Sequence, residues 1–365
     1  MYLEELVREV RTRDAVGRID DVGLQFNLFA AADRTPEVDC SVAESENGDK
    51  GSFRIDLTVK GLKLGEHSYP PGAQLRQFEP ETDIRKRHLE HPDLEGYVPD
   101  HLPLRPLPMQ LADELRVARR IDSEVDRDRS RNELHEATTI FPPDDRYTFN
   151  DTAYPWSTCG RIETPGGSAS GAMVGPRHVL TCSHAIQWNS DGTAGWVKFT
   201  PSYFDGSAPF GVAWGTWIYW EGLKVFGPTI NSSEGRHDYV CVVLNWNIGN
   251  VTGWMGSRTY SDSWDGGNYW SHIGYPGDLA AGLRPSFQGG ISLDGSFWDP
   301  QNHQRIYHQG DVWPGQSGGP FFGWWSGESF PRVVADQSGQ TSGENSASGG
   351  AHMVDCIIRA RNDFP

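Results

Sequence analysis

The chain has 365 residues and a formal net charge of −17 at pH 7, which disfavours nucleic acids and anionic membranes as binding partners. It contains no run of eighteen apolar residues, so the sequence predicts no membrane-spanning helix. The length allows two domains.

The first part of the chain is predicted to be a mixed, partly helical segment. Apolar residues in the stretch 3–10 recur at helical spacing, whereas the stretch 53–62 alternates apolar and polar residues as a strand does. The proline-rich stretch 101–109 predicts an extended linker, and the charged stretch 109–137 predicts a helix.

A change in composition marks the end of this segment. All fourteen tryptophans follow residue 155, and the earlier part is rich in Arg, Asp and Glu. The sequence therefore predicts a boundary between an N-terminal segment, 1–137, and a second domain, 138–365.

The second domain is predicted to be mostly β. Short runs of β-branched and aromatic residues, such as VLTC and YVCVVL, are separated by clusters of Gly, Asn, Asp, Ser and Pro. That pattern is typical of an all-β sandwich or barrel. The tail 353–361 fits either a C-terminal helix or a strand.

Ser317 lies in the most informative motif, GQSGGP. Small residues on both sides let the backbone turn sharply and bring its N–H groups toward a developing oxyanion. A serine hydroxyl becomes a nucleophile only with a base and an orienting acid. The structural alternative is that Ser317 belongs to an ordinary glycine-rich turn.

His184 and Asp238 are candidates for that base and acid. His184 follows an apolar run in HVLTCSHAI, and Asp238 precedes another in RHDYVCVVL. Each alone could be a strand cap or a turn residue. The chain order His184, Asp238, Ser317 is, however, the order of the chymotrypsin-type triad, and coincidence explains three such motifs poorly.

The region 146–358 resembles the glutamyl endopeptidase branch of the trypsin-like, chymotrypsin-fold serine proteases. The matching stretches are RYTFNDTAYPW, GAMVGPRHVLTCSHAI, HDYVCVVL, IGNVTGWMG, HIGYPGDLAAG and GQSGGP. The resemblance implies a chymotrypsin-like double six-stranded antiparallel β-barrel, with the active site in the cleft between the barrels.

The resemblance also implies a serine endopeptidase that needs no cofactor and acts as a monomer on peptide or protein substrates. Ser317 would attack the scissile carbonyl, His184 would act as the base, and Asp238 would orient the imidazole. The backbone N–H groups of Gly315 and Ser317 would stabilise the oxyanion.

The role of the segment 1–137 has two interpretations. Relatives of this branch are made as precursors, which favours a propeptide that is cleaved between about Glu136 and Phe141. The alternative is a regulatory domain that stays attached and recruits clients. A further possibility is a catalytically idle, protease-like binding protein, but the triad residues and the glycine before Ser317 are all kept.

The predicted specificity pocket departs from the family pattern. Glutamyl endopeptidases carry a histidine on the strand after the serine, and the matching text VVADQSG has Asp336 there, followed by Gln337. Asp311 lies six residues before Ser317, where trypsin-type enzymes place the pocket acid. Carboxylates would repel glutamate and attract a cation, so the sequence predicts a preference for Lys or Arg before the cut bond.

Cysteines and histidines outside these motifs predict no further chemistry. Cys182 and Cys241 are on neighbouring strands in the family fold and could approach each other, although two small core residues are the favoured interpretation. No His/Cys cluster has zinc-ligand spacing, so no metal is predicted. His237 is interpreted as a surface or loop histidine.

Signals for location point in different directions. The first residues are too polar for a secretory signal. Three Asn-X-Ser/Thr triplets suit a secreted protein, and together with the resemblance they favour an extracellular location.

Overall fold

The computed structural model describes residues 37–44, 53–60, 72–77, 93–105, 134–136, 139–191, 193–227, 229–295, 303–340 and 343–365. The chain divides into two compact units, one of Met1–Tyr69 with Asp205–Ser207 and one of Pro70–Phe204 with Ala208–Pro365. In the first unit, β1 (Glu37–Glu44) and β2 (Phe53–Lys60) form an antiparallel pair. The predicted strand 53–62 is thus confirmed, and the predicted helix 3–10 lies outside the described residues.

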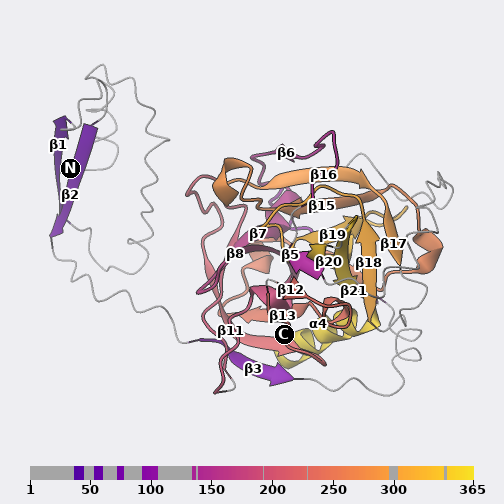
Figure 1. The fold of residues 1–365 in the computed structure, drawn as a ribbon. Helices are drawn as coiled ribbons and strands as arrows, with labels where there is room; N and C mark the ends of the chain where they lie inside the picture. Colours follow the sequence, from indigo (N-terminus) through magenta and orange to yellow (C-terminus); the bar gives the residue numbers. More distant parts are fainter. Residues whose placement is uncertain are drawn as a thin grey trace. The chain divides into compact units, whose positions relative to one another are not determined.

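A closed antiparallel barrel forms the first half of the larger unit (Figure 1). Its sheet runs in the order β10-β7-β8-β9-β13-β11, and the pairing of β10 with β11 closes it. The strand bounds are β7 Cys159–Thr164, β8 Gly167–Gly175, β9 His178–Thr181, β10 Lys198–Pro201, β11 Ala213–Trp220 and β13 Val240–Leu244. Apolar side chains of these strands fill the interior, including Ile162, Val179, Phe199, Ile218 and Val242.

The second half is a half-barrel. Its main sheet runs in the order β17-β18-β21-β20-β19-β15-β16-β6, and β14 pairs with β20. The bounds are β6 Tyr147–Thr148, β14 Gly256–Arg258, β15 Trp270–Gly274, β16 Ser286–Ile291, β17 Leu293–Gly295, β18 Gln304–His308, β19 Pro320–Gly323, β20 Arg332–Gln340 and β21 Asn345–Gly349. The mostly β, chymotrypsin-like double-barrel fold is thereby confirmed.

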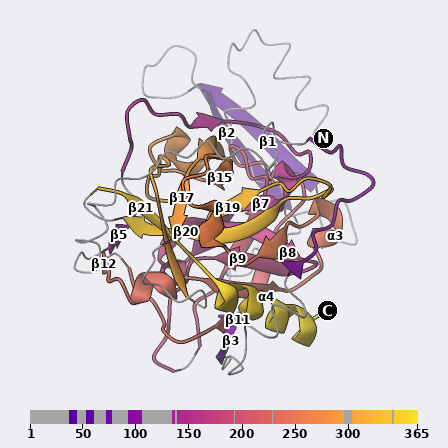
Figure 2. The ribbon, with the colours of Figure 1, turned by 90° about the vertical axis from the view of Figure 1, so that its right-hand side faces the viewer.

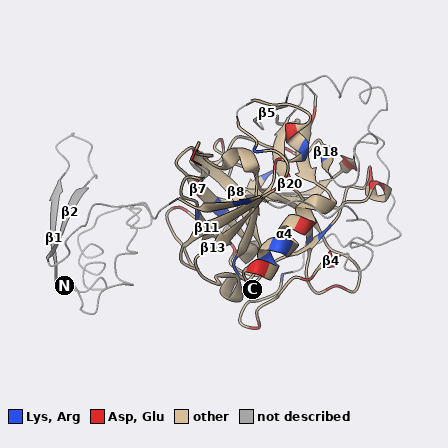
Figure 3. Cartoon of the chain, turned by 90° about the horizontal axis from the view of Figure 1, so that it is seen from below, with Lys and Arg blue, Asp and Glu red and all other residues tan. Residues whose placement is uncertain are grey.

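Helix α4 (Ala351–Asp363) resolves the ambiguous tail as a helix. It packs against β11 and β13 of the first barrel, as Figures 1 and 2 both show. Its buried side chains Met353, Val354, Cys356 and Ile357 join the core shared by the two halves, while acidic and basic residues also occur along it (Figure 3). Helix α4, which follows the last strand of the second half, therefore packs the two halves together.

The other helices among the described residues are single turns. They are the short helix α3 (Gly249–Thr252) and the 3₁₀ turns Trp156–Thr158, Ser183–Ala185, Glu234–Arg236, Asp262–Trp264 and Ala280–Gly282. None of the helices in the described part of the chain is long and apolar enough to cross a membrane.

Parts of the predicted N-terminal segment pair with the barrels. Strand β3 (Gln74–Gln77) lies parallel to β11, and β4 (Asp93–Leu94) pairs with β14. Strand β5 (Leu134–Glu136) lies between β20 and β12 (Thr229–Ile230). The sequence predicts a helix over 109–137, and for Leu134–Glu136 this prediction is wrong. These residues form a strand because their backbone pairs with the edge of β20. The rest of that helix lies outside the described residues.

Four of the five cysteines are free and buried, namely Cys159, Cys182, Cys241 and Cys356. This agrees with the interpretation of Cys182 and Cys241 as small core residues. Burial raises the pKa of the Cys182 thiol to about 11, so that thiol is uncharged at neutral pH.

Candidate active site

Ser317 lies in a tight loop that leads into β19. Gly315 and Gly318 have φ angles of 102° and 78°, a region that favours glycine. A Cβ on Gly315 would lie 2.4 Å from the carbonyl oxygen of Tyr275, so no larger residue fits there. The loop is also tied to the first barrel, because Ser170 donates from Oγ to Gly315 O at 2.7 Å and from N to Ser317 O at 2.8 Å.

His184 and Asp238 meet because their strands are neighbours. His184 follows β9, Asp238 precedes β13, and the register sets Val240 opposite Thr181. Asp238 Oδ2 lies 2.7 Å from His184 Nδ1, and Asp238 Oδ1 accepts the backbone N–H of His184 at 2.8 Å. The carboxylate therefore fixes both the position and the orientation of the imidazole.

Ser338 on β20 completes the surroundings of Asp238. Its hydroxyl donates to Asp238 Oδ2 at 2.6 Å, and Asp238 is fully buried. A buried carboxylate needs hydrogen-bond donors to remain charged, and three now surround this one. Burial opposes the charge on His184, but the Asp238 carboxylate outweighs it and raises the pKa of His184 well above its usual value.

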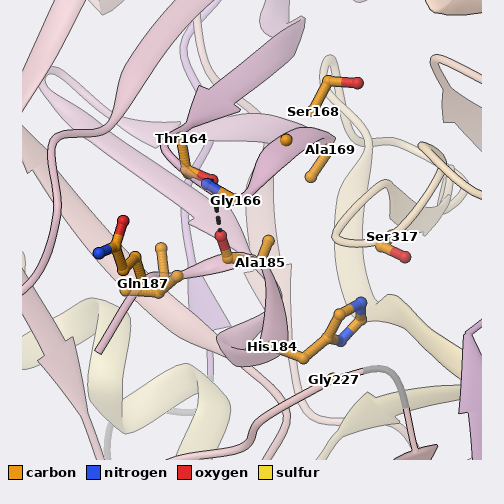
Figure 4. A pocket seen from close by; sticks show the side chains of 11 residues that line it. Thr164, Gly166, Ser168, Ala169, His184, Ala185, Gln187, Gly227 and Ser317 are labelled. Atoms are coloured by element: carbon orange, nitrogen blue, oxygen red, sulfur yellow. Dashed lines mark hydrogen bonds between the residues drawn. The ribbon is translucent and has the colours of Figure 1, made fainter. Parts of the chain in front are cut away.

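A pocket of about 330 Å³ opens beside these groups (Figure 4). Ser317 and His184 both line it, together with Thr164, Gly166, Gly167, Ser168, Ala169, Ala185, Ile186, Gln187 and Gly227. The two halves of the molecule thus present a hydroxyl and an imidazole to one cavity. Ser317 Oγ has no hydrogen-bond partner among the described residues. His184 Nε2 lies 3.7 Å from Cys182 Sγ.

The three residues named for the specificity pocket have different surroundings. Asp311 accepts hydrogen bonds from the backbone N–H groups of Phe141 at 2.6 Å and Asp145 at 2.9 Å. Asp336 is fully buried, and neither of its oxygens has a partner among the described residues. Gln337 is buried on β20, with Oε1 2.9 Å from His308 Nε2. Asp311 and Gln337 are therefore already engaged.

Asp336 belongs with Asp238 rather than with an open pocket. Burial raises the pKa of Asp336 well above its usual value, and the nearby Asp238 carboxylate adds to this effect. Since both carboxyls face the same interior, a protonated Asp336 avoids a second buried negative charge next to His184.

Arg146 is a positioning residue that the sequence did not single out. Its buried guanidinium donates to Gln316 Oε1 at 2.8 Å and to the carboxylates of Asp144 and Asp278 at 2.9 and 2.5 Å. Gln316 immediately precedes Ser317, so this cluster holds the serine loop against the RYTFNDTAYPW and GYPGD stretches. Both stretches are among those that resemble the protease family, but the sequence does not show that they lie beside the Ser317 loop. Only the folded structure shows this contact.

The chain is similar to known proteins in sequence and in fold. The chain is 31% identical over 187 residues to the glutamyl endopeptidase of Bacillus licheniformis, which covers 50% of this chain and 54% of that protein. The chain thus spans about half the length of that curated relative. No family model matches the chain.

A solved structure shows the same fold. A Glu endopeptidase in complex with MPD superposes with a TM-score of 0.50 and 21% identity, covering 61% of this chain and all of that one. The protease Anisep from Arthrobacter nicotinovorans superposes with a TM-score of 0.43 and 21% identity over 56% of this chain and 93% of that one. The resemblance to the glutamyl endopeptidase branch is thus found as a sequence similarity over half of the chain, and the chymotrypsin-like fold is confirmed by the structure.

Proposed function

We propose that the chain is a serine endopeptidase that hydrolyses peptide bonds through an acyl-enzyme and is made as a precursor. The observation that carries this proposal is the His184–Asp238 pair with its buried Ser338 donor, facing a pocket that Ser317 also lines. Such a charge-oriented imidazole beside an unpartnered hydroxyl is the arrangement that nucleophilic catalysis requires.

The proposed reaction has two halves: acylation of Ser317 and hydrolysis of the acyl-enzyme. Ser317 Oγ attacks the scissile carbonyl while His184 takes its proton, and the oxyanion is held by the backbone N–H groups of Gly315 and Ser317. His184 then protonates the leaving amine, and the acyl-enzyme remains on Ser317. Water, deprotonated by His184, releases the acid and restores the serine.

A short movement is needed before the first step. Ser317 Oγ accepts and donates no hydrogen bond to described residues, so the Ser317–His184 contact has to form when substrate binds. Catalytic hydrogen bonds are often longer or misaligned in the free enzyme and tighten in the substrate complex.

Labelling with a fluorophosphonate probe tests the proposed nucleophile. We expect covalent modification at Ser317, identified by peptide mapping, and loss of labelling in Ser317→Ala. Peptide hydrolysis should fall by about 10⁴ to 10⁶ in Ser317→Ala and in His184→Ala, with little further loss in the double variant. If the probe never labels the chain and the chain never cleaves peptides, the result would instead support the alternative of a catalytically idle, protease-like binding protein.

The precursor part of the proposal is supported by the placement of β5. Its backbone pairs with β20 at Gly339 and Gln340, next to Ser338, and with β12 on the other side. Farther along, Thr139 O accepts from Val312 N at 3.2 Å and from Asn345 Nδ2 at 3.0 Å. An uncut chain would therefore keep its own segment on an edge that a peptide could otherwise pair with.

The preference for Lys or Arg before the cut bond remains a prediction. It requires Asp311 to exchange the amides of Phe141 and Asp145 for a substrate cation, so we expect it only after the segment 139–145 has moved. Asp336, buried and proton-binding, would add little attraction. Hydrolysis rates for matched peptides ending in Lys, Arg, Leu and Glu test this, and a clear preference for Glu would overturn it.

A further inference from the structure

Four metal-binding side chains meet where the two barrels adjoin, outside the groups that the proposed reaction uses. Glu221 follows β11, and His237 stands just before Asp238 and β13, so both come from the first barrel. His303 precedes β18, and His352 is in the first turn of α4, so both come from the second half. We propose that these four residues form a zinc site that joins the two barrels.

The ligand atoms of Glu221, His303 and His352 all lie within 4.8 Å of one another, a spacing that one ion can span, and His237 lies just outside this group. Glu221 Oε2 lies 3.4 Å from His303 Nδ1, 3.5 Å from His352 Nδ1 and 4.0 Å from His237 Nε2. Zinc–nitrogen and zinc–oxygen bonds of about 2.0–2.2 Å in a tetrahedron put neighbouring ligand atoms about 3.3–3.6 Å apart. Small side-chain shifts would bring the most distant nitrogen, that of His237, into this range.

The ring nitrogens that face the carboxylate lack other partners. The Nδ1 atoms of His303 and His352 are buried and make no hydrogen bond within the described part of the chain. The side chains of Glu221 and His352 are only 7% and 8% exposed. Both nitrogens face Glu221 Oε2 at 3.4 and 3.5 Å without forming a hydrogen bond, which is costly for buried polar atoms, and a metal ion between the three atoms would satisfy them all.

Outer contacts orient two of the proposed ligands. His237 Nδ1 lies 3.0 Å from Ser233 O, a contact that places the ring proton on Nδ1 and leaves the lone pair of Nε2 facing Glu221. The hydroxyl of Tyr239 donates to Glu221 Oε2 at 3.2 Å. Second partners of this kind fix the tautomer of a metal-binding histidine and the position of a metal-binding carboxylate.

The donor set selects the type of metal. Three imidazoles and one carboxylate suit zinc, whereas calcium and magnesium prefer oxygen ligands. Four protein ligands leave no open position for substrate or water, so the site would be structural rather than catalytic. Its place next to Asp238 means that metal binding would steady the loop that orients His184.

Metal analysis of the purified full-length chain tests the proposal. Chelator-stripped protein is titrated with zinc alone by calorimetry, and with cobalt alone by absorption spectroscopy. We expect a one-to-one site, the intense visible absorption of tetrahedral cobalt, and a higher melting temperature with zinc. His303→Ala and His352→Ala should weaken binding more than about 100-fold, because even outer partners of a ligand cost 10- to 100-fold.

The control is His101→Ala, since His101 is an exposed histidine whose ring contacts Val251 O, and it should bind zinc like the unaltered chain. If an alanine variant fails to fold, Glu221→Gln and the cobalt spectrum of the unaltered chain decide. A stripped chain that binds no zinc, an octahedral cobalt spectrum, or unchanged affinity in the folded variants would overturn the proposal. These readouts do not depend on peptidase activity.

Discussion

The hydroxyl of Ser338 donates a 2.6 Å hydrogen bond to Oδ2 of Asp238, the same oxygen that lies 2.7 Å from His184 Nδ1. The two residues are 100 positions apart in the chain, and they come from different barrels. This bond therefore transmits the position of β20 to the imidazole. It also gives β20 two roles, because the same strand pairs with β5.

Ser338→Ala should reduce kcat while leaving KM nearly unchanged. A hydrogen bond to a charged group contributes about 1.5–3 kcal/mol, which corresponds to roughly a 10- to 100-fold loss in rate. Steady-state hydrolysis of a peptide by the processed enzyme measures the effect. Ser263→Ala, an exposed serine on a 3₁₀ turn, is the matched control. Equal rates for both variants would contradict the proposed role.

Asp336→Asn should stabilise the protein increasingly as the pH rises. The folded-state pKa of Asp336 is raised, so from about pH 4 up to that pKa the folded state holds a proton that the unfolded state has lost. In the protein that keeps Asp336, this group therefore lowers the free energy of unfolding by up to about 1.4 kcal/mol for each pH unit of increase. Asparagine has no such proton, so the difference in free energy of unfolding grows over this range.

Urea titrations at several pH values between 4 and 8 measure that difference. Both proteins should carry Ser317→Ala, so that self-digestion does not distort the curves. A difference that stays constant across the range, or that shrinks as the pH rises, would show that Asp336 is ionised in the folded protein.

Arg146→Met should destabilise the fold and slow catalysis together. The change removes one of the two donors to Gln316 Oε1, which keeps only the backbone N–H of Trp313, and separates Asp278 from its charge partner. We expect a loss of about 2–3 kcal/mol, below the usual cost of breaking a fully buried pair because the two carboxylates are partly exposed. Denaturant unfolding and peptide hydrolysis provide the two readouts.

The control for this prediction is Arg105→Met. The Arg105 side chain is 64% exposed and pairs with Asp151, so its loss should cost less than about 1 kcal/mol. If both arginine variants unfold at the same denaturant concentration, the cluster around Gln316 has no special importance.

Cleavage between about Glu136 and Phe141 should accompany activation. The uncut chain should react with a fluorophosphonate, which is small, but should hydrolyse peptides slowly because β5 occupies the edge of β20. Replacing Leu134 and Glu136 by proline removes backbone N–H donors and should raise peptide hydrolysis more than labelling. N-terminal sequencing identifies the cut, and an uncut chain with full peptidase activity would rule out this form of control.

The motif residues could be predicted from sequence because each is fixed locally. Ser317 needs small neighbours, and His184 and Asp238 each adjoin an apolar strand whose pairing partner is the other's strand. Asp336 was harder to place. Side chains alternate between the two faces of β20, but the strand has a register irregularity between Gln337 and Gly339. Because a shift of one residue moves a side chain to the opposite face, the sequence alone does not determine which face Asp336 is on.

The remaining groups depend on contacts between distant segments. Ser338, Arg146 and Glu221 carry no local pattern. Ser338 meets Asp238, and Glu221 meets His303 and His352, only when the two halves pack together, whereas Arg146 meets Asp278 and Gln316 when distant segments of the second half come together. The sequence favours a surface or loop position for His237, because adjacent residues on a strand point to opposite faces and Asp238 was assigned to the site. The spacing of Glu221, His303 and His352 along the chain resembles no zinc motif, since each comes from a different element.

Strands β3 and β4 precede the expected cut, yet their ladders belong to the barrels: four residues of β3 lie in register with β11, and β4 pairs with β14. Hydrolysis of one peptide bond changes connectivity without breaking a single one of these backbone contacts. The immediate product would thus be a nicked, two-chain complex. The severed N-terminal piece would then have to dissociate from the barrels. The dissociation rate would determine the delay between cleavage and full exposure of the barrels.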